Sequence, residues 1–495
     1  MVPTPKLRSR GSSDGRGVAT WTEVAVIGSG PGGAVTACLL SESGREVTLI
    51  EEGRDLAADR PRQFSIGEMA EKYRNGGVTA LLGNPKIAYV EGRCVGGGSE
   101  INSGLYHRTP PEALERWRTE FLVQDLDEQT LRPHFEQCER DVCVSLLPCD
   151  APAASRRLDA GARQLGWKSL EVPRWISFGA ARDAGDRSAG PAGLRQTMSR
   201  TYIPRALAAG CQLIAETRVT RLRRLPRGWA IEMIDSSGRE SRLNAETVFV
   251  ACGAIHSPAL LQRSGLGSNA GRSLHVHPTV KLVAEFEEQV NGWNSGVGVH
   301  QVKEFSPRLG FGCSVASPPH LGLAMLDHPR ETRRLEDSWP NMAVYYAMTT
   351  GGRGSVRALP GFRDPLVRFR LAEPEMRDLA DGLWKLSEAL FAAGATTLFP
   401  AVRGAAAVRG RRELSQIPAL LSRGAANLMT IHLFSTCPMG EDRRRCTADS
   451  YGKVHGEQNL YLADASLLCT APGVNPQGSI MAIARRNALH FLANS

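Results

Sequence analysis

The feature that most constrains this chain is a glycine-rich turn between two apolar runs, in the stretch TEVAVIGSGPGGAVTACLLSESGREVTLIEEG. Residues 23–27 are mostly apolar and partly β-branched, which predicts a buried strand. The run after the turn predicts a helix up to Ser43, and residues 47–50 predict a second strand that ends at Glu51. A strand–turn–helix–strand unit opens a parallel sheet covered by helices, so we expect a Rossmann-like α/β domain.

The turn holds Gly28, Gly30 and Gly33 in G-x-G-x-x-G spacing. In such a unit one glycine makes the tight turn, one lets the backbone approach a pyrophosphate, and one permits close helix–strand packing. The helix start offers N–H groups to the anion, and Glu51 is placed to accept hydrogen bonds from ribose hydroxyls. A glycine-rich turn without a ligand is the alternative. The complete unit favours a dinucleotide without choosing between NAD and FAD.

Length and charge narrow the class of protein. The chain has 495 residues, too many for one ordinary domain, and its 42% apolar and 22% charged residues are globular values. We therefore expect two intertwined domains with a sizeable core. The net charge is +9, but the arginines are scattered, so an anionic cofactor or plain solvation explains the excess. We expect no nucleic-acid partner.

Cysteine usage and the N-terminus bear on location. Eleven cysteines without CxxC pairs are typical of reduced, mostly buried thiols, which favours a cytoplasmic protein. Residues 1–20 are polar, basic and rich in glycine and serine, and they lack the apolar core of a signal peptide. We expect a flexible leader there. No apolar run reaches the roughly 18 residues of a membrane span, so we expect no stable membrane anchor.

A second glycine-rich stretch is EGRCVGGGSEINSGLYHR, residues 91–108. Gly96 to Gly98 beside Ser99 and Asn102 indicate backbone that lies against a flat or phosphorylated ligand, with a flexible surface loop as the alternative. Further on, VFVACGAIHSPALLQRSGLG (residues 248–267) predicts a strand, a turn and a helix whose Ser257-Pro258 pair suits its cap and first turn.

Together with residues 432–440 and 459–483, these stretches resemble the glucose–methanol–choline (GMC) oxidoreductase family of FAD-dependent alcohol oxidases and dehydrogenases. Residues 253–267 match the family's second signature, and Gly92 to Asn102 match the first, with Gly98 where serine is common. The motifs follow the family's order and span nearly the whole chain.

The resemblance implies a discontinuous FAD-binding domain and an interleaved substrate-binding domain. The segments assigned to FAD binding are 21–125, 195–272 and 430–495, and those assigned to substrate binding are 126–194 and 273–429. In the second set, residues 281–287, 342–348 and 366–372 predict strands. A helix with an apolar face follows them; its face carries Leu379, Leu383, Leu386 and Leu390. An α+β domain built on an antiparallel sheet is therefore expected.

The resemblance also assigns the FAD contacts. Glu51 would hold the adenosine ribose, and Val219 would contact adenine through its backbone. Asp464 and Ala465 would approach the ribityl chain and the pyrophosphate. The positions that would bind the pyrophosphate or lie against the isoalloxazine ring are Gly28, Gly30, Gly33, Arg93, Gly97, Ser99 and Asn102. Some relatives attach FAD through a histidine at the position of Ile101, so we expect non-covalent FAD here.

The catalytic residues implied by the resemblance lie near the C-terminus. HLFSTCPMG (residues 432–440) places His432 on the family's catalytic histidine, and its partner is Asn475 in PGVNPQG. Loss of hydride from an alcohol carbon needs removal of the hydroxyl proton, for which a neutral imidazole is a suitable base. Asn475 precedes Pro476, so it also suits a helix N-cap. The helix start at Pro476 would stabilise negative charge on reduced flavin.

Other histidines and cysteines rank lower. His275 and His277 favour a structural role near the domain junction; metal binding by two histidines at this spacing is weakly supported, and we expect no metal. His107, His256 and His455 are expected to be surface or packing residues. Cys437 favours packing over the nucleophile of a Cys–His hydrolase.

The expected reaction is FAD-dependent oxidation of an alcohol to an aldehyde or ketone, with proton abstraction at His432 and hydride transfer to flavin N5. The electron acceptor would be oxygen or another acceptor. A small polyol, sugar or glycoside in bacterial, even antibiotic, metabolism is the expected substrate. The alternatives are a sterol or long-chain alcohol, an FAD-containing lyase or decarboxylase of the same family, and a flavin-binding protein without activity.

Overall fold

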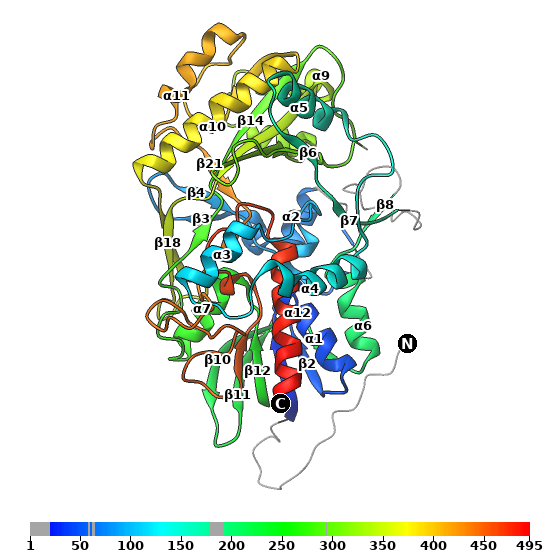
Figure 1. Cartoon of the computed structure of the whole chain (residues 1–495), viewed down its shortest axis with the longest axis vertical. Helices are drawn as coiled ribbons and strands as arrows, with labels where there is room; N and C mark the ends of the chain where they lie inside the picture. Colours follow the sequence, from blue (N-terminus) through cyan, green and yellow to red (C-terminus); the bar gives the residue numbers. More distant parts are fainter. Residues whose placement is uncertain (1–19, 58–59, 62–64, 179–192, 294) are drawn as a thin grey trace.

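The computed structural model describes residues 20–57, 60–61, 65–178, 193–293 and 295–495. The predicted leader, residues 1–20, lies outside the described residues except for Thr20, which begins the first strand. Two sheets dominate the structure, one near each end of the long axis (Figure 1). Within the described residues, no helix combines the length and apolar character that a membrane crossing requires. All eleven cysteines are free thiols.

The first sheet has seven strands in the order β10-β11-β12-β1-β2-β9, with β23 paired to the end of β12. Its strands β1, β2, β9, β12 and β23 pair in parallel, and β10 and β11 add an antiparallel edge. The strand bounds are β1 Thr20–Ile27, β2 Val47–Ile50, β9 Gln212–Ile214, β10 Thr217–Arg224, β11 Trp229–Asp235, β12 Glu240–Val250 and β23 Leu460–Leu462. This is the expected Rossmann-like arrangement, in which the strand ends present a ligand crevice.

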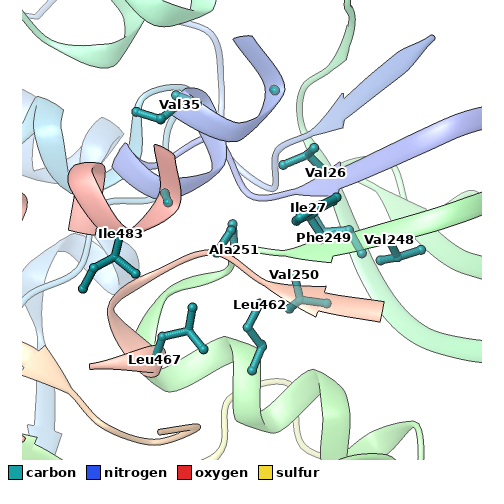
Figure 2. Close-up of a cluster of buried hydrophobic side chains, with 14 of the residues drawn as sticks. Val26, Ile27, Val35, Val248, Phe249, Val250, Ala251, Leu462, Leu467 and Ile483 are labelled. Atoms are coloured by element: carbon teal, nitrogen blue, oxygen red, sulfur yellow. The ribbon is translucent and has the colours of Figure 1, made fainter. Parts of the chain in front are cut away.

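Helices cover this sheet. They are α1 Pro31–Glu42, α3 Pro111–Glu120, α4 Glu128–Asp141, α6 Tyr202–Ala208, α7 Gly253–Arg263 and α12 Gln477–Asn494. Helix α1 packs against both α6 and α12, and α12 packs against α4. Figure 2 shows the core beneath them, where Val26 of β1, Phe249 of β12, Leu462 of β23 and Ile483 of α12 meet. Strands central to a parallel sheet are buried on both faces, which explains the continuous apolar runs in their sequences.

The second sheet has nine strands in the order β3-β4-β21-β14-β17-β16-β15-β6, with β20 also paired to β14. The strand bounds are β3 Thr79–Leu81, β4 Ile87–Tyr89, β6 Ser169–Glu171, β14 Thr279–Phe286, β15 His300–Val302, β16 Leu309–Cys313, β17 Met342–Thr349, β20 Ala395–Pro400 and β21 Leu428–Thr430. All its pairs are antiparallel except β4 with β21. Helices α5 (Ala153–Gln164) and α10 (Glu373–Ala392) pack on one face (Figure 1).

Smaller elements complete the chain. They are α2 Ile66–Lys72, α8 Pro318–Ala324, α9 Leu335–Ser338, α11 Ile417–Leu420, β5 Val144–Ser145, β7 Arg174–Phe178, β8 Gly193–Arg195, β13 His275–Val276, β18 Arg353–Arg357, β19 Leu366–Arg370 and β22 Leu433–Phe434. The run predicted as a strand at 366–372 forms β19, but it pairs with β18 in a two-stranded ribbon rather than in the large sheet.

Two segments lie away from the sides that the predicted boundaries gave them. Residues 79–89, predicted in the FAD-binding segment 21–125, form β3 and β4 and join the nine-stranded sheet through β21. Helix α4, predicted on the substrate side, packs its apolar face into the first core, because Leu131 and Phe135 are buried there. Boundaries drawn from motifs miss such exchanges, since no motif marks them.

The last part of the chain returns to the first sheet. Strand β23 pairs with β12, and α12 runs back along α1 (Figure 1). Earlier in this part of the chain, β22 pairs with β13, which leads into β14 of the second sheet. These pairings bring residues 432 and 475 to the junction of the two sheets.

Candidate active site

A cavity at this junction is lined by the first glycine turn, by residues 90–92, 97–98 and 101–105, and by the starts of α7 and α12. Gly28 has a φ of +103°, and a Cβ there would lie 2.2 Å from the Ala251 carbonyl oxygen. At Gly30 a Cβ would meet nothing within 4 Å, so its backbone is open to the cavity. Gly33 does not line the cavity: a Cβ there would lie 1.9 Å from the Gly28 carbonyl oxygen. No side chain caps the start of α1, which leaves its first N–H groups available to an anion.

Glu51 sits at the end of β2 and lines the same cavity. Its carboxylate accepts hydrogen bonds from the Ser29 amide (3.0 Å), the Ser29 hydroxyl (2.6 Å) and the Gly53 amide (2.9 Å). Burial raises the pKa of Glu51, while these donors act to lower it. Ser29 Oγ also accepts from the Gly96 amide at 3.0 Å. Glu51 therefore joins the first glycine turn to the second glycine stretch.

The second glycine stretch lies against the first. Gly97 has a φ of +53°, and a Cβ there would lie 2.8 Å from the Gly30 Cα. Gly98 is open on the side where a Cβ would stand. Asn102 lines the cavity and donates from Nδ2 to Gln477 Oε1 at 2.7 Å. Ile101, which stands where some relatives carry a histidine, also lines the cavity.

Arg93 and Ser99 do not line the cavity, although the sequence predicted that both contact the flavin. Arg93 Nε points toward Glu52 Oε1 at 3.6 Å. Ser99 is fully buried; its hydroxyl donates to the Gly96 carbonyl at 2.7 Å and accepts from the Met198 amide at 3.0 Å. Within this loop the cavity is lined by Gly97, Gly98 and residues 101–105, whereas Arg93 and Ser99 make their contacts elsewhere.

Asp464 and Ala465 line the cavity where β23 ends. The Asp464 carboxylate accepts from the Gly253 amide at 2.9 Å, from the Ser466 amide at 2.8 Å and from the Ser257 hydroxyl. These bonds tie the end of β23 to the start of α7. The serine of the Ser257-Pro258 pair thus holds Asp464 rather than capping its own helix.

Charged residues that sequence analysis did not single out also line the cavity. They are Glu52, Arg74, Glu91, Arg218, Arg263, Arg363 and Asp364. His256, predicted to be a surface or packing residue, also lines the cavity, and its Nε2 lies 3.6 Å from Glu91 Oε2. Its signal in the sequence was its position in the first turn of α7, directly after the Gly253-Ala254 turn.

His432 and Asn475 lie together in the cavity. Asn475 Nδ2 is 3.4 Å from His432 Nε2, and both residues line the cavity beside Pro476 and Gln477. Burial lowers the pKa of His432 to about 4, so its imidazole is neutral at pH 7. The predicted N-cap role of Asn475 is wrong, since α12 begins at Gln477 and Pro476 occupies the cap position. The Asn475 amide is therefore free to face the cavity.

His277 is the buried partner of His432. Its Nδ1 lies 2.9 Å from His432 Nδ1, and its Nε2 accepts a hydrogen bond from the Gly473 amide at 3.1 Å. His277 is fully buried, and burial lowers its pKa well below the usual value. The structural role predicted for His277 is therefore a direct contact with His432, the predicted catalytic residue.

The series Gly473–His277–His432–Asn475 has an amide donor at each end. With both end donors in place, only the proton between the two Nδ1 atoms belongs to a ring, whereas two neutral imidazoles carry two protons. One end donor must therefore turn away. If the Asn475 amide turns, His432 Nε2 carries the proton and donates; if the Gly473 amide turns, His432 Nε2 is free to accept.

Gln301, His107 and Tyr346 extend this network. Gln301 Nε2 donates to Asn475 Oδ1 and to Tyr346 Oη, each at 3.1 Å, and Gln301 Oε1 lies 3.1 Å from His107 Nε2. Burial lowers the pKa of His107 to about 3. Sequence analysis placed His107 at the surface or in packing, because it follows the part of the second glycine stretch that matches a signature, and missed Gln301, because Gln301 lies in no motif.

Two further predictions concern metals and Cys437. Among the described residues, no group of three or more histidine, cysteine or acidic side chains could hold a metal ion. Cys437 is fully buried, and burial raises the pKa of its thiol, as for a packing residue. His275 lines no part of the cavity, and burial lowers its pKa to about 4.

Both the sequence and the fold of this chain resemble those of known proteins. Residues 69–279 and 351–484 match the two family models of GMC oxidoreductases, and residues 26–66 match an NAD(P)-binding Rossmann-like domain. An uncharacterized GMC-type oxidoreductase of Sinorhizobium fredii is 39% identical over 485 residues, 96% of this chain and 95% of that protein. The chain belongs to the GMC oxidoreductase family. This GMC protein is therefore an FAD-dependent oxidoreductase.

More distant relatives of this GMC oxidoreductase include a long-chain-alcohol oxidase of Arabidopsis thaliana, 24% identical over 513 residues, covering 93% of this chain and 65% of the relative. Among solved structures, pyridoxine 4-oxidase from Mesorbium loti has a TM-score of 0.73 at 18% identity, covering 95% of this chain and 99% of that one. Formate oxidase has a TM-score of 0.73 at 14% identity, covering 96% and 99%. These structures share the fold.

The cavity of the GMC protein fits FAD in its chemistry. Gly28 and Gly97 hold positive φ angles where side chains would collide with backbone, and Gly30 and Gly98 leave the cavity wall open. The uncapped start of α1 suits a pyrophosphate, and Glu51 at the end of β2 suits a ribose.

Proposed function

We propose that this GMC oxidoreductase oxidises an alcohol to an aldehyde or ketone, with the hydroxyl oxygen held between His432 and Asn475. The observation that carries the proposal is the shared cavity: His432 and Asn475 line the same cavity as the dinucleotide-binding glycines. Bound FAD would accept the hydride that leaves the carbon. The residues that would hold FAD are Gly28, Gly30, Glu51, Gly97, Asn102, Val219, Asp464, Ala465 and Pro476.

The chain's own part in the reaction is to position the hydroxyl group and take its proton. In the state with Nε2 free, His432 accepts the hydroxyl proton at Nε2 while its Nδ1 proton remains directed at His277. Asn475 Nδ2 donates to the same oxygen and stabilises the charge that develops on it. Because burial keeps His432 neutral at pH 7, its Nε2 lone pair is available once the tautomer permits.

We propose non-covalent attachment of FAD, because Ile101 supplies no nucleophile where some relatives carry a histidine. Acid precipitation of the yellow protein is expected to release all flavin into the supernatant. Flavin retained in the washed precipitate would contradict this part of the proposal. The substrate class that fits best is a small polar alcohol, such as a polyol, sugar or glycoside, because Asn475 belongs to a polar hydrogen-bond network with Gln301, His107 and Tyr346.

Anaerobic mixing of the purified holoprotein with alcohols tests the reaction. Oxidation bleaches the flavin absorbance, whereas a lyase or decarboxylase of the same fold turns over without net bleaching. His432→Ala is expected to keep bound FAD and to slow bleaching by about a thousandfold or more, since general base catalysis contributes roughly 10²–10⁴. Bleaching by His432→Ala at the wild-type rate would refute the assigned base.

A further inference from the structure

One face of the nine-stranded sheet is directed at the reactive corner, the part of the site where His432 and Asn475 meet. Direct cross-strand partners share a face, and the register aligns Gln301 with Gly312, Gly312 with Tyr346, and Tyr346 with Lys281. Gln301 hydrogen-bonds Asn475, so this face looks toward the site. The opposite face carries buried apolar residues and is covered by α10, because Gly382 of α10 packs against Phe311 and Ala347.

Lys303 lies on the site face, just beyond the end of β15. Its amide donates to the Lys168 carbonyl at 2.9 Å, which continues the pairing of β15 with β6. Side chains two residues apart on a strand point the same way, so Lys303 follows Gln301 toward the site. The next strand offers Gly310 and Gly312 there, which leaves this part of the face without side chains from β16.

Neither lysine of this face has an acidic partner among the described residues. Burial alone lowers the pKa of Lys303, and likewise of Lys281, to about 8; a nearby carboxylate would act in the opposite direction. The Lys303 charge lowers the pKa of both His107 and His277, which places it in the electrostatic range of the reactive corner. A half-buried ammonium group without a counter-ion is costly, and an anionic ligand would offset that cost.

We infer that Lys303 binds an anionic group of the substrate, a carboxylate or a phosphate, while the reacting hydroxyl lies at His432 and Asn475. The substrate class is thus an alcohol that carries a carboxylate or phosphate at its other end. This inference rests on the proposed alcohol oxidation for the identity of the reacting group, but the anion subsite itself does not.

The first test measures anion binding without turnover. Acetate and inorganic phosphate are titrated into the oxidised holoprotein, and the change in flavin absorbance reports occupancy. Lys303→Gln is expected to weaken binding of the preferred anion about tenfold to a hundredfold, because it removes a charge-assisted hydrogen bond. Lys86→Gln is the matched control: it removes the same charge from an exposed position just before β4, away from the register that places Lys303. Equal binding by Lys303→Gln and Lys86→Gln would overturn the inference.

The second test compares matched alcohols by anaerobic flavin reduction: benzyl alcohol with 4-(hydroxymethyl)benzoate, and butan-1-ol with 4-hydroxybutyrate. We expect the wild type to show at least a tenfold lower apparent Kd for the anionic member of a pair. Lys303→Gln should abolish that difference, and Lys86→Gln should keep it. If both members of each pair reduce the flavin with equal apparent Kd, the subsite fails and alcohol oxidation stands. If no alcohol reduces the flavin while anion binding still depends on Lys303, the oxidation fails and the subsite stands.

Discussion

The contact between His277 and His432 predicts a rate effect that can be separated from folding. In His277→Leu, His432 Nδ1 loses its partner at 2.9 Å and faces an apolar side chain. A buried polar group left without a hydrogen bond costs about 1–3 kcal/mol. If that cost falls on the state that accepts the hydroxyl proton, flavin reduction should slow by about tenfold to a hundredfold.

His277→Asn separates loss of the contact from loss of the ring. The asparagine amide oxygen can stand near the former Nδ1 position and accept the Nδ1 proton of His432. That acceptor favours the tautomer in which His432 Nε2 is free. We therefore expect His277→Asn to reduce its flavin faster than His277→Leu, even though both lose the bond from the Gly473 amide.

The assay is stopped-flow reduction under anaerobic conditions, with rates normalised to the flavin content of each variant and followed across pH. His275→Leu serves as the control, because His275 is a nearby partly buried histidine outside the cavity. It should lower stability without changing the normalised rate. Wild-type rates in His277→Leu, or equal slowing in His275→Leu, would refute the reasoning about the proton series.

Two further predictions concern the first glycine turn (residues 28–33), called the glycine cradle below, and the stability of the protein in acid. Gly30→Ala should weaken FAD binding while leaving the melting temperature of the apoprotein near that of the wild type. Gly33→Ala should destabilise the fold itself by about 1–3 kcal/mol or more, because the added methyl group overpacks the turn. Flavin titration and thermal melts distinguish the two variants, and equal melting temperatures for the two apoproteins would contradict this. Folded-state pKa values of about 3 for His107 and about 4 for His432 lie below the usual value near 6.5, so their contribution to stability is complete above pH 6.5 and is lost as pH falls toward 4. Buried Glu51 and Asp464, with raised pKa values, act in the opposite sense but are fewer than the buried histidines; a melting temperature that stays level from pH 7 to 4.5 would show that the histidines do not dominate.

The sequence predicted those parts of the fold that local chemistry dictates. The glycine turn, strand β2 directly before Glu51 and the leucine face of α10 all follow from spacing and period. It did not predict that β3 and β4 cross to the other sheet, since strand partners are chosen by tertiary packing.

The residues of the candidate site likewise include some that the sequence predicted and some that it did not. His432 and Asn475 were predicted from the family resemblance of the motifs that contain them, and both line the cavity. Gln301, Lys303 and the role of His277 were not, because their meaning arises from cross-strand register and from contacts between distant segments. Arg93 and Ser99 were assigned to the flavin because they lie in a motif, but the direction of a side chain within a loop cannot be read from its neighbours.

The order in which the chain is synthesised gives the pairing of β23 with β12 a consequence for the cell. A ribosome releases the glycine cradle of β1 and α1 hundreds of residues before β23 and α12 emerge. Until then, Val248 to Val250 lack the strand β23 that pairs with them. His432 and Asn475 have not yet reached the glycine cradle. A product that terminates early would expose an open strand edge, which chaperones and proteases recognise. The candidate active site is therefore assembled only when translation of the chain is nearly complete.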